Sequence, residues 1–373
     1  MPTVRVPLLD SAGARLARSE GFETATVLAT RGSSPEGAPG RGRPPHNSGA
    51  VSGESRLGRV TRRNYHFCVV HPCQFPAVYI NLVSLFMKLL TFRYARQSNP
   101  VDHAGVVVEG GIAPILEINS RFDKHYPNNL LELIQAGAKD IPTQGIPPIP
   151  FEQVEPRLPY DVPPKIWCIG LNYHSHAVDI DAVQPEEPGS FMKPASCMFQ
   201  PGGEILLPPP EFSDDVDAEG ELGVVIGRTC RYVPRDRAQE VIFGFTTTLD
   251  LTALDVLRKN PRYLTRSKSF DTFFSFGPVI VTTDEAPDVE SLEVITEHND
   301  GICSRDFVRN MKMRPFDLVA YHSDYMTLHP GDLISTGCPK GARIKAGDRV
   351  AARIEGVGRI EARVRQGERA PIY

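Results

Sequence analysis

Asp217-Ala-Glu-Gly-Glu-Leu-Gly-Val-Val-Ile-Gly227 is the segment that decides the fold, because it joins two carboxylates to an apolar run. The run predicts a buried β-strand, in which Glu219 and Glu221 share one face. Two like charges so close to each other and to a hydrophobic run destabilise each other unless a cation lies between them. The alternative is a solvated strand end with two surface glutamates, since Glu-x-Glu alone is a common pattern.

A third carboxylate follows the next β-rich run. Asp250 comes directly after Phe243-Gly-Phe-Thr-Thr-Thr-Leu249 and can bring another oxygen ligand to the same place. Three carboxylates without His or Cys beside them favour a hard cation, Mg²⁺ with Mn²⁺ or Ca²⁺ as alternatives, over zinc. Taken alone, an Asp near a strand end is more often a cap or a turn residue.

A candidate base lies in Gly170-Leu-Asn-Tyr-His-Ser-His-Ala-Val-Asp179. If His176 begins a helical turn, Asp179 lies on the same face three residues later and its carboxylate can fix the tautomer of the ring. The other ring nitrogen is then the base that activates water. His174 is a rival for this role, and a His near an exposed turn is most often structural.

These segments belong to a longer succession of motifs that ends at Ser335-Thr-Gly337. The others are Lys165-Ile-Trp-Cys-Ile-Gly-Leu-Asn-Tyr-His-Ser-His176, Phe191-Met-Lys-Pro194, the 217–227 segment, Thr265-Arg-Ser-Lys-Ser-Phe-Asp-Thr272, Phe276-Gly-Pro278 and Met326-Thr-Leu-His-Pro-Gly-Asp332. In order and spacing the succession resembles the catalytic domain of the fumarylacetoacetate hydrolase family over about residues 165–365.

The resemblance implies a mostly β fold with some α: a rolled, mixed β-sandwich that binds Mg²⁺ or a related ion, usually in a homodimer. The positions that match are the metal ligands Glu219, Glu221 and Asp250, the catalytic His176, the substrate-side Lys268 and the substrate-contacting Thr336. Asp179 joins the catalytic set as the partner of the histidine, and Lys193 before Pro194 is a further candidate for substrate binding. Without the resemblance, both lysines would be interpreted as surface residues and Thr336 as a turn hydroxyl.

Several positions depart from the usual pattern of the family. Asp179 stands where some members have Glu, and Cys338 stands where Thr is common. Leu249 and Leu254 replace polar residues frequent around the metal aspartate, and Thr252 stands for a usual Ser. These changes keep the three carboxylates and leave the substrate open.

The chain divides by composition. Residues 1–86 carry ten Arg and no Lys, are rich in Gly, Pro and Ser, and lack sustained apolar periods. We interpret them as a disordered or non-native leader, with Met87 as the alternative natural start, and an organellar transit peptide as a further alternative. A small N-terminal α+β domain is predicted over 87–140, a proline-rich linker over 141–164, and the catalytic domain over 165–373.

Local patterns predict several elements. They are a strand from Met87, a hairpin turn at the paired glycines of 104–112, a helix over 128–136 stopped by Gly137, a helix over 235–243 ended by Gly244, and a hairpin over 350–364.

Composition limits the partners and the compartment. The net charge of -4, with an acidic body after the leader, argues against nucleic acid as a partner. Seven Cys at irregular spacing and no secretory signal favour a reduced, cytoplasmic location, with a mitochondrial one as the alternative. The apolar stretch Phe75–Leu90 is shorter than the roughly 20 residues of a membrane span.

The sequence thus predicts a metal-dependent hydrolase that cleaves a C–C bond in a small oxo-acid, either an acylpyruvate or a fumarylacetoacetate-like compound. A decarboxylase or isomerase of oxaloacetate or a 2-oxo or 2-hydroxy-dienedioate at the same site is the alternative, because each reaction passes through the same enolate. A non-catalytic metal-binding protein stays open as a second class. His66, Cys68, His71 and Cys73 could form a zinc knot, but their spacing lacks the separated pairs of zinc modules.

Overall fold

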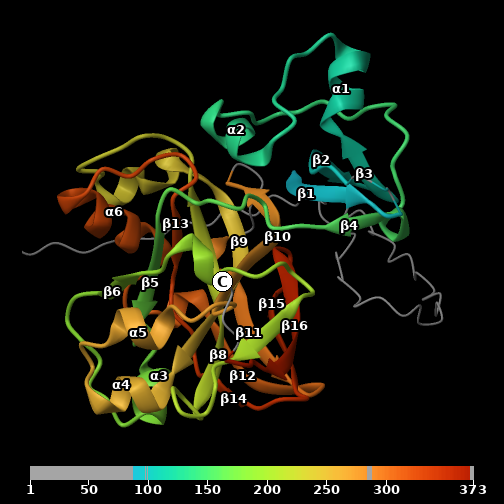
Figure 1. The fold of residues 1–373 in the computed structure, drawn as a ribbon. Helices are drawn as coiled ribbons and strands as arrows, with labels where there is room; N and C mark the ends of the chain where they lie inside the picture. Colours follow the sequence, from blue (N-terminus) through green and yellow to red (C-terminus); the bar gives the residue numbers. More distant parts are fainter. Residues whose placement is uncertain (1–86, 97, 99, 284–287, 370–373) are drawn as a thin grey trace, which may run out of the picture. The chain divides into compact units, whose positions relative to one another are not determined.

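The computed structural model describes residues 87–369, apart from 97, 99 and 284–287 (Figure 1). The predicted leader, the four candidate zinc-knot residues and most of Phe75–Leu90 lie outside the described residues. Within the described part, no helix has both the length and the apolar character needed to cross a membrane.

An 11-stranded mixed sheet forms the larger layer of the fold. Its order is β3-β2-β1-β10-β9-β8-β13-β5-β6, with β4 beside β1 and β14 beside β8. β13 and β5 run parallel, whereas the other pairs of this sheet are antiparallel. The strands are β1 (Lys88–Tyr94), β2 (His103–Val108), β3 (Gly111–Pro114), β4 (Val154–Pro156), β5 (Ile166–Gly170), β6 (Gly189–Met192), β8 (Val216–Ile226), β9 (Ile242–Ala253), β10 (Phe274–Thr282), β13 (Leu333–Ser335) and β14 (Ala342–Ile344).

A second sheet has the order β12-β11-β15-β16-β7. Its strands are β7 (Glu204–Leu207), β11 (Glu293–His298), β12 (Gly301–Phe307), β15 (Arg349–Ile354) and β16 (Gly358–Gln366). β16 and β7 run parallel, so this sheet is mixed as well. The two sheets pack against each other through β11, β15 and β16 on one side and β8, β9 and β10 on the other. This arrangement of two mixed sheets confirms the predicted fold class.

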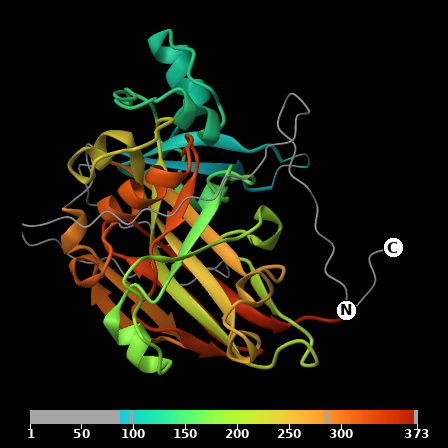
Figure 2. The same cartoon turned by 90° about the vertical axis from the view of Figure 1, so that its left-hand side faces the viewer.

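Strands β8 and β9 lie at the centre of the fold, and every residue of both is buried. Figures 1 and 2 show these two strands side by side, with β10 next to β9. Gly220 of β8 lets the second sheet approach closely: a Cβ atom there would lie 2.8 Å from Thr296 Oγ1 and 3.0 Å from Ala352 Cβ. Because neighbouring strand residues point to opposite faces, Glu219 and Glu221 point away from the second sheet.

The helices are short. They are α1 (Ile115–Phe122), α2 (Leu130–Gln135), α3 (His174–Asp179), α4 (Leu254–Lys259), α5 (Leu264–Lys268) and α6 (Pro315–Tyr325), with 3-10 turns η1 (Phe151–Gln153), η2 (Ala195–Cys197), η3 (Arg235–Val241), η4 (Val289–Ser291) and η5 (Val308–Asn310). Asn129 caps α2 by accepting a hydrogen bond from the Glu132 amide at 3.1 Å, and Gly137 follows the helix with a φ of +63°. The predicted helix over 128–136 is therefore confirmed, with its boundaries drawn in to Leu130–Gln135.

The predicted hairpins are confirmed as β2–β3 and β15–β16. The predicted helix over 235–243 is wrong at its end, because Ile242 and Phe243 already belong to β9. Gly244 does not stop a helix; a Cβ atom there would lie 2.2 Å from the carbonyl oxygen of Val281, so the glycine allows β10 to approach.

The segment before the catalytic region joins the large sheet. β1 pairs with β10, placing Leu89 opposite Ile280, and β4, within the predicted linker 141–164, pairs with the other end of β1. The strands that precede residue 165 therefore extend the sheet that carries the carboxylates.

Candidate metal centre

Strand register brings the three predicted carboxylates together. Glu219 on β8 lies directly opposite Asp250 on β9, and Glu221 lies opposite Thr248. Glu219, Glu221 and Asp250 are 4%, 1% and 0% exposed. One oxygen of each lies within 4.8 Å of the other two. We call these three residues the carboxylate cluster.

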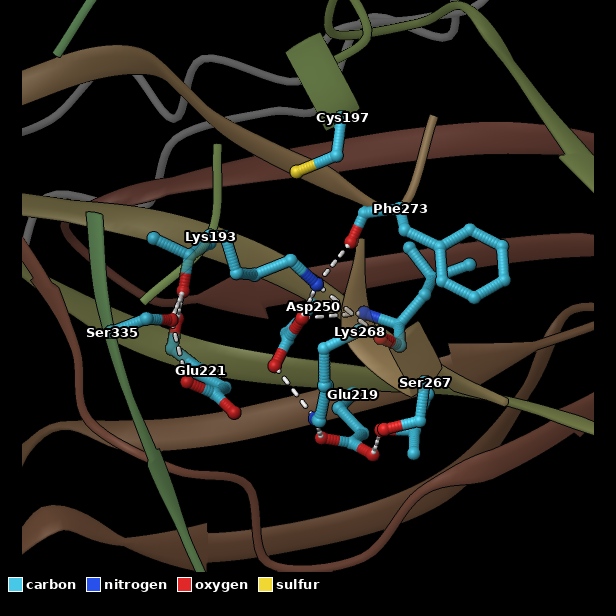
Figure 3. A network of polar contacts seen from close by, with 12 residues as sticks. Lys193, Cys197, Glu219, Glu221, Asp250, Ser267, Lys268, Phe273 and Ser335 are labelled. Atoms are coloured by element: carbon cyan, nitrogen blue, oxygen red, sulfur yellow. Dashed lines mark hydrogen bonds and ion pairs between the residues drawn. The ribbon is translucent and has the colours of Figure 1, made fainter. Parts of the chain in front are cut away.

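Two buried lysines contact the carboxylate cluster from different segments (Figure 3). Lys193, just after β6, donates to Asp250 Oδ1 and, at 2.8 Å, to the carbonyl oxygen of Phe273. Lys268, the last residue of α5, donates to Glu219 Oε2 at 2.9 Å and to Asp250 Oδ2 at 2.8 Å. Three carboxylates therefore share two ammonium groups, which leaves the cluster short of positive charge.

Hydroxyl and amide donors hold the two glutamates in place. Thr252 Oγ1 donates to Glu219 Oε1, and Ser335 Oγ donates to Glu221 Oε2. The amide of Gly337 donates to the same Glu221 oxygen at 2.9 Å. These bonds fix the carboxylate orientations before any ligand arrives, which is the property expected of a preformed ion site.

Burial and neighbouring charges shift the pKa values of the carboxyl groups in opposite directions. Burial, followed by the charges of Asp250 and Glu219, raises the pKa of Glu221 to about 8. Burial alone would also raise the pKa of Asp250, but Lys193 and Lys268 outweigh it and hold this pKa below its usual value. Burial opposes the charge of Lys268 too, yet the three carboxylates keep its pKa well above the usual value. Glu221 is thus where additional positive charge would be most stabilising.

The donor set fits a hard divalent cation. It consists of carboxylate oxygens that are buried, converging and short of one positive charge, and carboxylates are ligands that Mg²⁺, Mn²⁺ and Ca²⁺ accept.

His176 lies beside the carboxylate cluster. It is 7% exposed in α3, and one of its ring nitrogens lies within 4.8 Å of a Glu219 oxygen and of Cys338 Sγ. Its Nδ1 is buried and has no hydrogen-bond partner among the described residues. The rival His174, in the same helix, is exposed.

The predicted pairing of His176 with Asp179 is not formed. Asp179 Oδ1 instead lies 2.6 Å from Lys340 Nζ in a partly exposed ion pair. Lys340 offers this carboxylate an ammonium group, and Asp179 is the last residue of the short helix, where its side chain is partly exposed to solvent.

The two predicted substrate-binding residues are engaged inside the protein. Lys193 has no exposed side-chain surface and contacts Asp250, as described above. Thr336 is fully buried, and its hydroxyl donates to the carbonyl oxygen of Leu222 at 2.9 Å.

Sequence reasoning missed the polar residues that support the site, although β9 carried a signal for them. Thr246, Thr248, Asp250 and Thr252 alternate along one face of a strand whose other residues are largely apolar. Such a polar stripe on a buried strand indicates a site and not a core face. The role of Ser335 had no comparable local signal.

Comparison with known proteins identifies the family. The family model described as fumarylacetoacetate (FAA) hydrolase C-terminal matches residues 165–365. The chain belongs to the fumarylacetoacetate hydrolase family. Another member is the mitochondrial oxaloacetate tautomerase FAHD2B of Homo sapiens, which is 32% identical over 289 residues, covering 74% of this chain and 90% of that protein.

Solved structures of the family share the fold. The maleylpyruvate hydrolase of Sphingobium sp. SYK-6, in complex with manganese(II) and pyruvate, is 30% identical with a TM-score of 0.61, covering 76% of this chain and all of that one. The 2-hydroxyhepta-2,4-diene-1,7-dioate isomerase of Mycobacterium marinum is 28% identical with a TM-score of 0.60, with the same coverage. Members of the family are thus hydrolases, isomerases and tautomerases.

Proposed function

We propose that this protein is a divalent-cation-dependent isomerase that interconverts the keto and enol forms of a small 2-oxo acid. Glu219, Glu221 and Asp250 would hold the cation, with Mg²⁺ or Mn²⁺ as the expected ion. When bound, such an ion supplies Lewis-acid polarisation of the substrate carbonyl. The substrate is expected to be oxaloacetate or a dicarboxylic acid of similar size.

His176 is the proton-transfer group of the proposed reaction. It would take a proton from the carbon next to the carbonyl and return it to the enol oxygen, or run in the reverse direction. Its position beside Glu219 brings the imidazole to the edge of the carboxylate cluster. Lys268, held by Glu219 and Asp250, adds positive charge close to the oxygen on which negative charge develops.

The observation that carries the choice of isomerisation over hydrolysis is the Nδ1 atom of His176, which lacks a hydrogen-bond partner within the described part of the chain. Activating water is easiest for a histidine whose second nitrogen is held by a carboxylate, which stabilises the imidazolium that forms. Here Nδ1 of His176 has no partner among the described residues, while Asp179 pairs with Lys340. Keto–enol exchange requires His176 only to move one proton between an acidic carbon and an oxygen of the substrate. This reaction depends less on a carboxylate that stabilises the imidazolium than the activation of water does.

Relatives with both activities resemble this chain. The human oxaloacetate tautomerase, which is 32% identical over 289 residues, supports isomerisation. C–C bond hydrolysis is the second candidate, and the Sphingobium hydrolase, whose structure contains pyruvate, favours it. Both reactions pass through an enolate at the same place, and they differ in whether water attacks.

The test is a comparison of two substrates with the same preparation. Keto–enol exchange of oxaloacetate is followed by ultraviolet absorbance, and cleavage of an acylpyruvate is followed by the appearance of pyruvate, each with chelator and with added Mg²⁺ or Mn²⁺. We expect metal-stimulated exchange and little cleavage. Metal-stimulated cleavage without exchange would replace this proposal by the hydrolase.

Three variants assign the roles. Glu221→Gln should remove both Mn²⁺ binding and metal-stimulated turnover, because the site loses one of its anionic ligands. His176→Ala should bind Mn²⁺ but turn over roughly 10²–10⁴-fold more slowly. Asp179→Asn should have a much smaller effect than His176→Ala. If Asp179→Asn lowers turnover as much as His176→Ala does, the two residues act as a dyad. Activation of water by His176, and with it the hydrolase, would then be favoured.

A further inference from the structure

A second group of ligand-type side chains adjoins the carboxylate cluster. His176 from α3, Glu219 from β8 and Cys338 from the loop after β13 each place one ligand atom within 4.8 Å of the other two. All three are buried: His176 is 7%, Glu219 4% and Cys338 1% exposed. We call them the thiol cluster. It shares Glu219 with the carboxylate cluster and otherwise uses different donors.

A second, independent observation concerns the ring of His176. Nδ1 of His176 is buried and has no hydrogen-bond partner among residues 87–369 that the structure describes. Buried polar groups are nearly always hydrogen-bonded, so an exception calls for a ligand or an ion. The neighbouring Cys338 is a free thiol, and it stands where the family resemblance leads us to expect Thr.

The donors of the two clusters differ in softness. Carboxylate oxygens favour hard ions, whereas a thiolate and an imidazole favour Zn²⁺ and related ions. A zinc site with three protein ligands and one open position commonly combines His, Cys or carboxylate donors. On coordination, the Cys338 thiol would release its proton to solvent.

We propose that His176, Glu219 and Cys338 form a binding site for a thiophilic divalent ion such as Zn²⁺, which adjoins the site of the activating cation and shares Glu219 with it. Binding there engages the His176 ring and therefore stops turnover. This inhibitory consequence rests on the proposed function of His176; the binding itself does not.

Cobalt(II) provides a direct readout of the ligands. Protein stripped with chelator is incubated with excess Mg²⁺, which occupies the carboxylate cluster, and then titrated with Co²⁺. Coordination by Cys338 should give a sulfur-to-cobalt charge-transfer band in the near ultraviolet, and added Zn²⁺ should remove it. No substrate is present, so the result does not depend on which reaction the protein catalyses.

Variants assign the band. Cys338→Ser, and Cys338→Thr as a second variant, should lose it. His176→Ala should weaken Co²⁺ binding by at least the roughly 10–100-fold that loss of an outer-shell partner costs. Cys303→Ser is the matched control, because Cys303 is a half-buried free thiol outside the thiol cluster, and this variant should keep the band.

Three outcomes would overturn the proposal. One is the absence of a charge-transfer band in the unmodified protein. Another is a band of unchanged affinity in Cys338→Ser, which would place the ion on another thiol such as Cys68 or Cys73. If the Cys338 variants do not fold, X-ray absorption of the zinc-loaded natural chain decides: a single sulfur at about 2.3 Å supports the site, and no sulfur or several sulfurs contradict it.

Discussion

Lys193 and Lys340 both pair with a carboxylate, but only one of the pairs is buried. The Lys193–Asp250 pair has side-chain exposures of 0% and 1%, whereas the Lys340–Asp179 pair has 48% and 25%. Without Lys193, the three buried carboxylates share only the ammonium of Lys268 in a medium that solvates charge poorly, whereas the exposed carboxylate of Asp179 is rehydrated when Lys340 is removed.

We therefore expect Lys193→Met to lower the free energy of unfolding by about 3–5 kcal/mol. Lys340→Met, the matched control, should lower it by about 0–1 kcal/mol. Urea denaturation in the presence of chelator measures both. Equal losses in the two variants would mean that Asp250 is rehydrated or protonated without its lysine.

His322 gives the stability a pH dependence. Its ring is fully buried, Nδ1 contacts the Leu318 carbonyl oxygen at 2.7 Å, and Nε2 contacts Ser190 Oγ at 2.8 Å. Burial lowers the pKa of this histidine from 6.5, although the bond to Leu318 acts in the opposite direction. In the unfolded chain the ring takes up a proton below about 6.5, while the folded protein resists it.

The unfolded state thus binds more protons below the unfolded pKa, and stability falls as the pH falls through this range. The His322 ring therefore contributes a decrease in the urea midpoint between about pH 7.5 and 5.5, whereas Glu221, whose pKa is raised to about 8 in the folded protein, contributes an increase over the same range. In His322→Phe, which keeps an aromatic ring beside Trp167, this decrease should be smaller, even if the variant is less stable overall. An unchanged pH slope in the variant would assign the dependence to other groups.

At the level of elements, Gly220 couples the two sheets to the site. Its amide donates to Thr296 Oγ1 at 3.1 Å, and a Cβ atom would come within 3.0 Å of Ala352 Cβ on β15. A methyl group there pushes β8 away from the second sheet and displaces the glutamates on either side of it in sequence.

Gly220→Ala should lower the free energy of unfolding by about 1–3 kcal/mol, the usual cost of overpacking. It should also weaken Mn²⁺ binding, measured by electron paramagnetic resonance. Gly301→Ala is the control, because the nearest atom to a Cβ atom there, the carbonyl oxygen of His298, is 3.5 Å away. A Gly220→Ala protein with full stability and full Mn²⁺ affinity would show that the sheets separate without cost.

The sequence predicts features that are local to one element better than features that depend on how two elements pair. The shared face of Glu219 and Glu221 follows from strand periodicity, which is local and was predicted correctly. The position of Asp250 opposite Glu219 depends on the register between β8 and β9. Local sequence patterns do not specify this register. The partner of Asp179 was predicted wrongly because Lys340 is distant in sequence, and helical spacing says nothing about such a residue.

At the scale of the whole molecule, strands β1 to β4 and the catalytic region share one sheet. Leu89 of β1 is fully buried and belongs to the same hydrophobic core as Phe276 and Ile280 of β10. A substitution that destabilises β1 should therefore also destabilise the sheet that holds the carboxylates.

Leu89→Ala should lower the free energy of unfolding by about 2–5 kcal/mol, because it leaves a cavity in this core. Calorimetry should show a single transition shifted as a unit. Val101→Ala, at a site 57% exposed, should change the unfolding free energy by less than about 0.5 kcal/mol. Two separate transitions, with only the first one shifted, would mean that the N-terminal segment melts independently of the catalytic region.

The contacts of Glu221 with Ser335 and Gly337, 114 and 116 positions later in the chain, impose an order of events on the newly made polypeptide. At about 5–20 residues per second, a ribosome makes Glu221 on the order of ten seconds before those partners. During that interval β8 lacks its neighbour β13, so one edge of an apolar strand stays open to other nascent chains on the same messenger. A chaperone that binds this edge during that interval would keep neighbouring nascent chains apart.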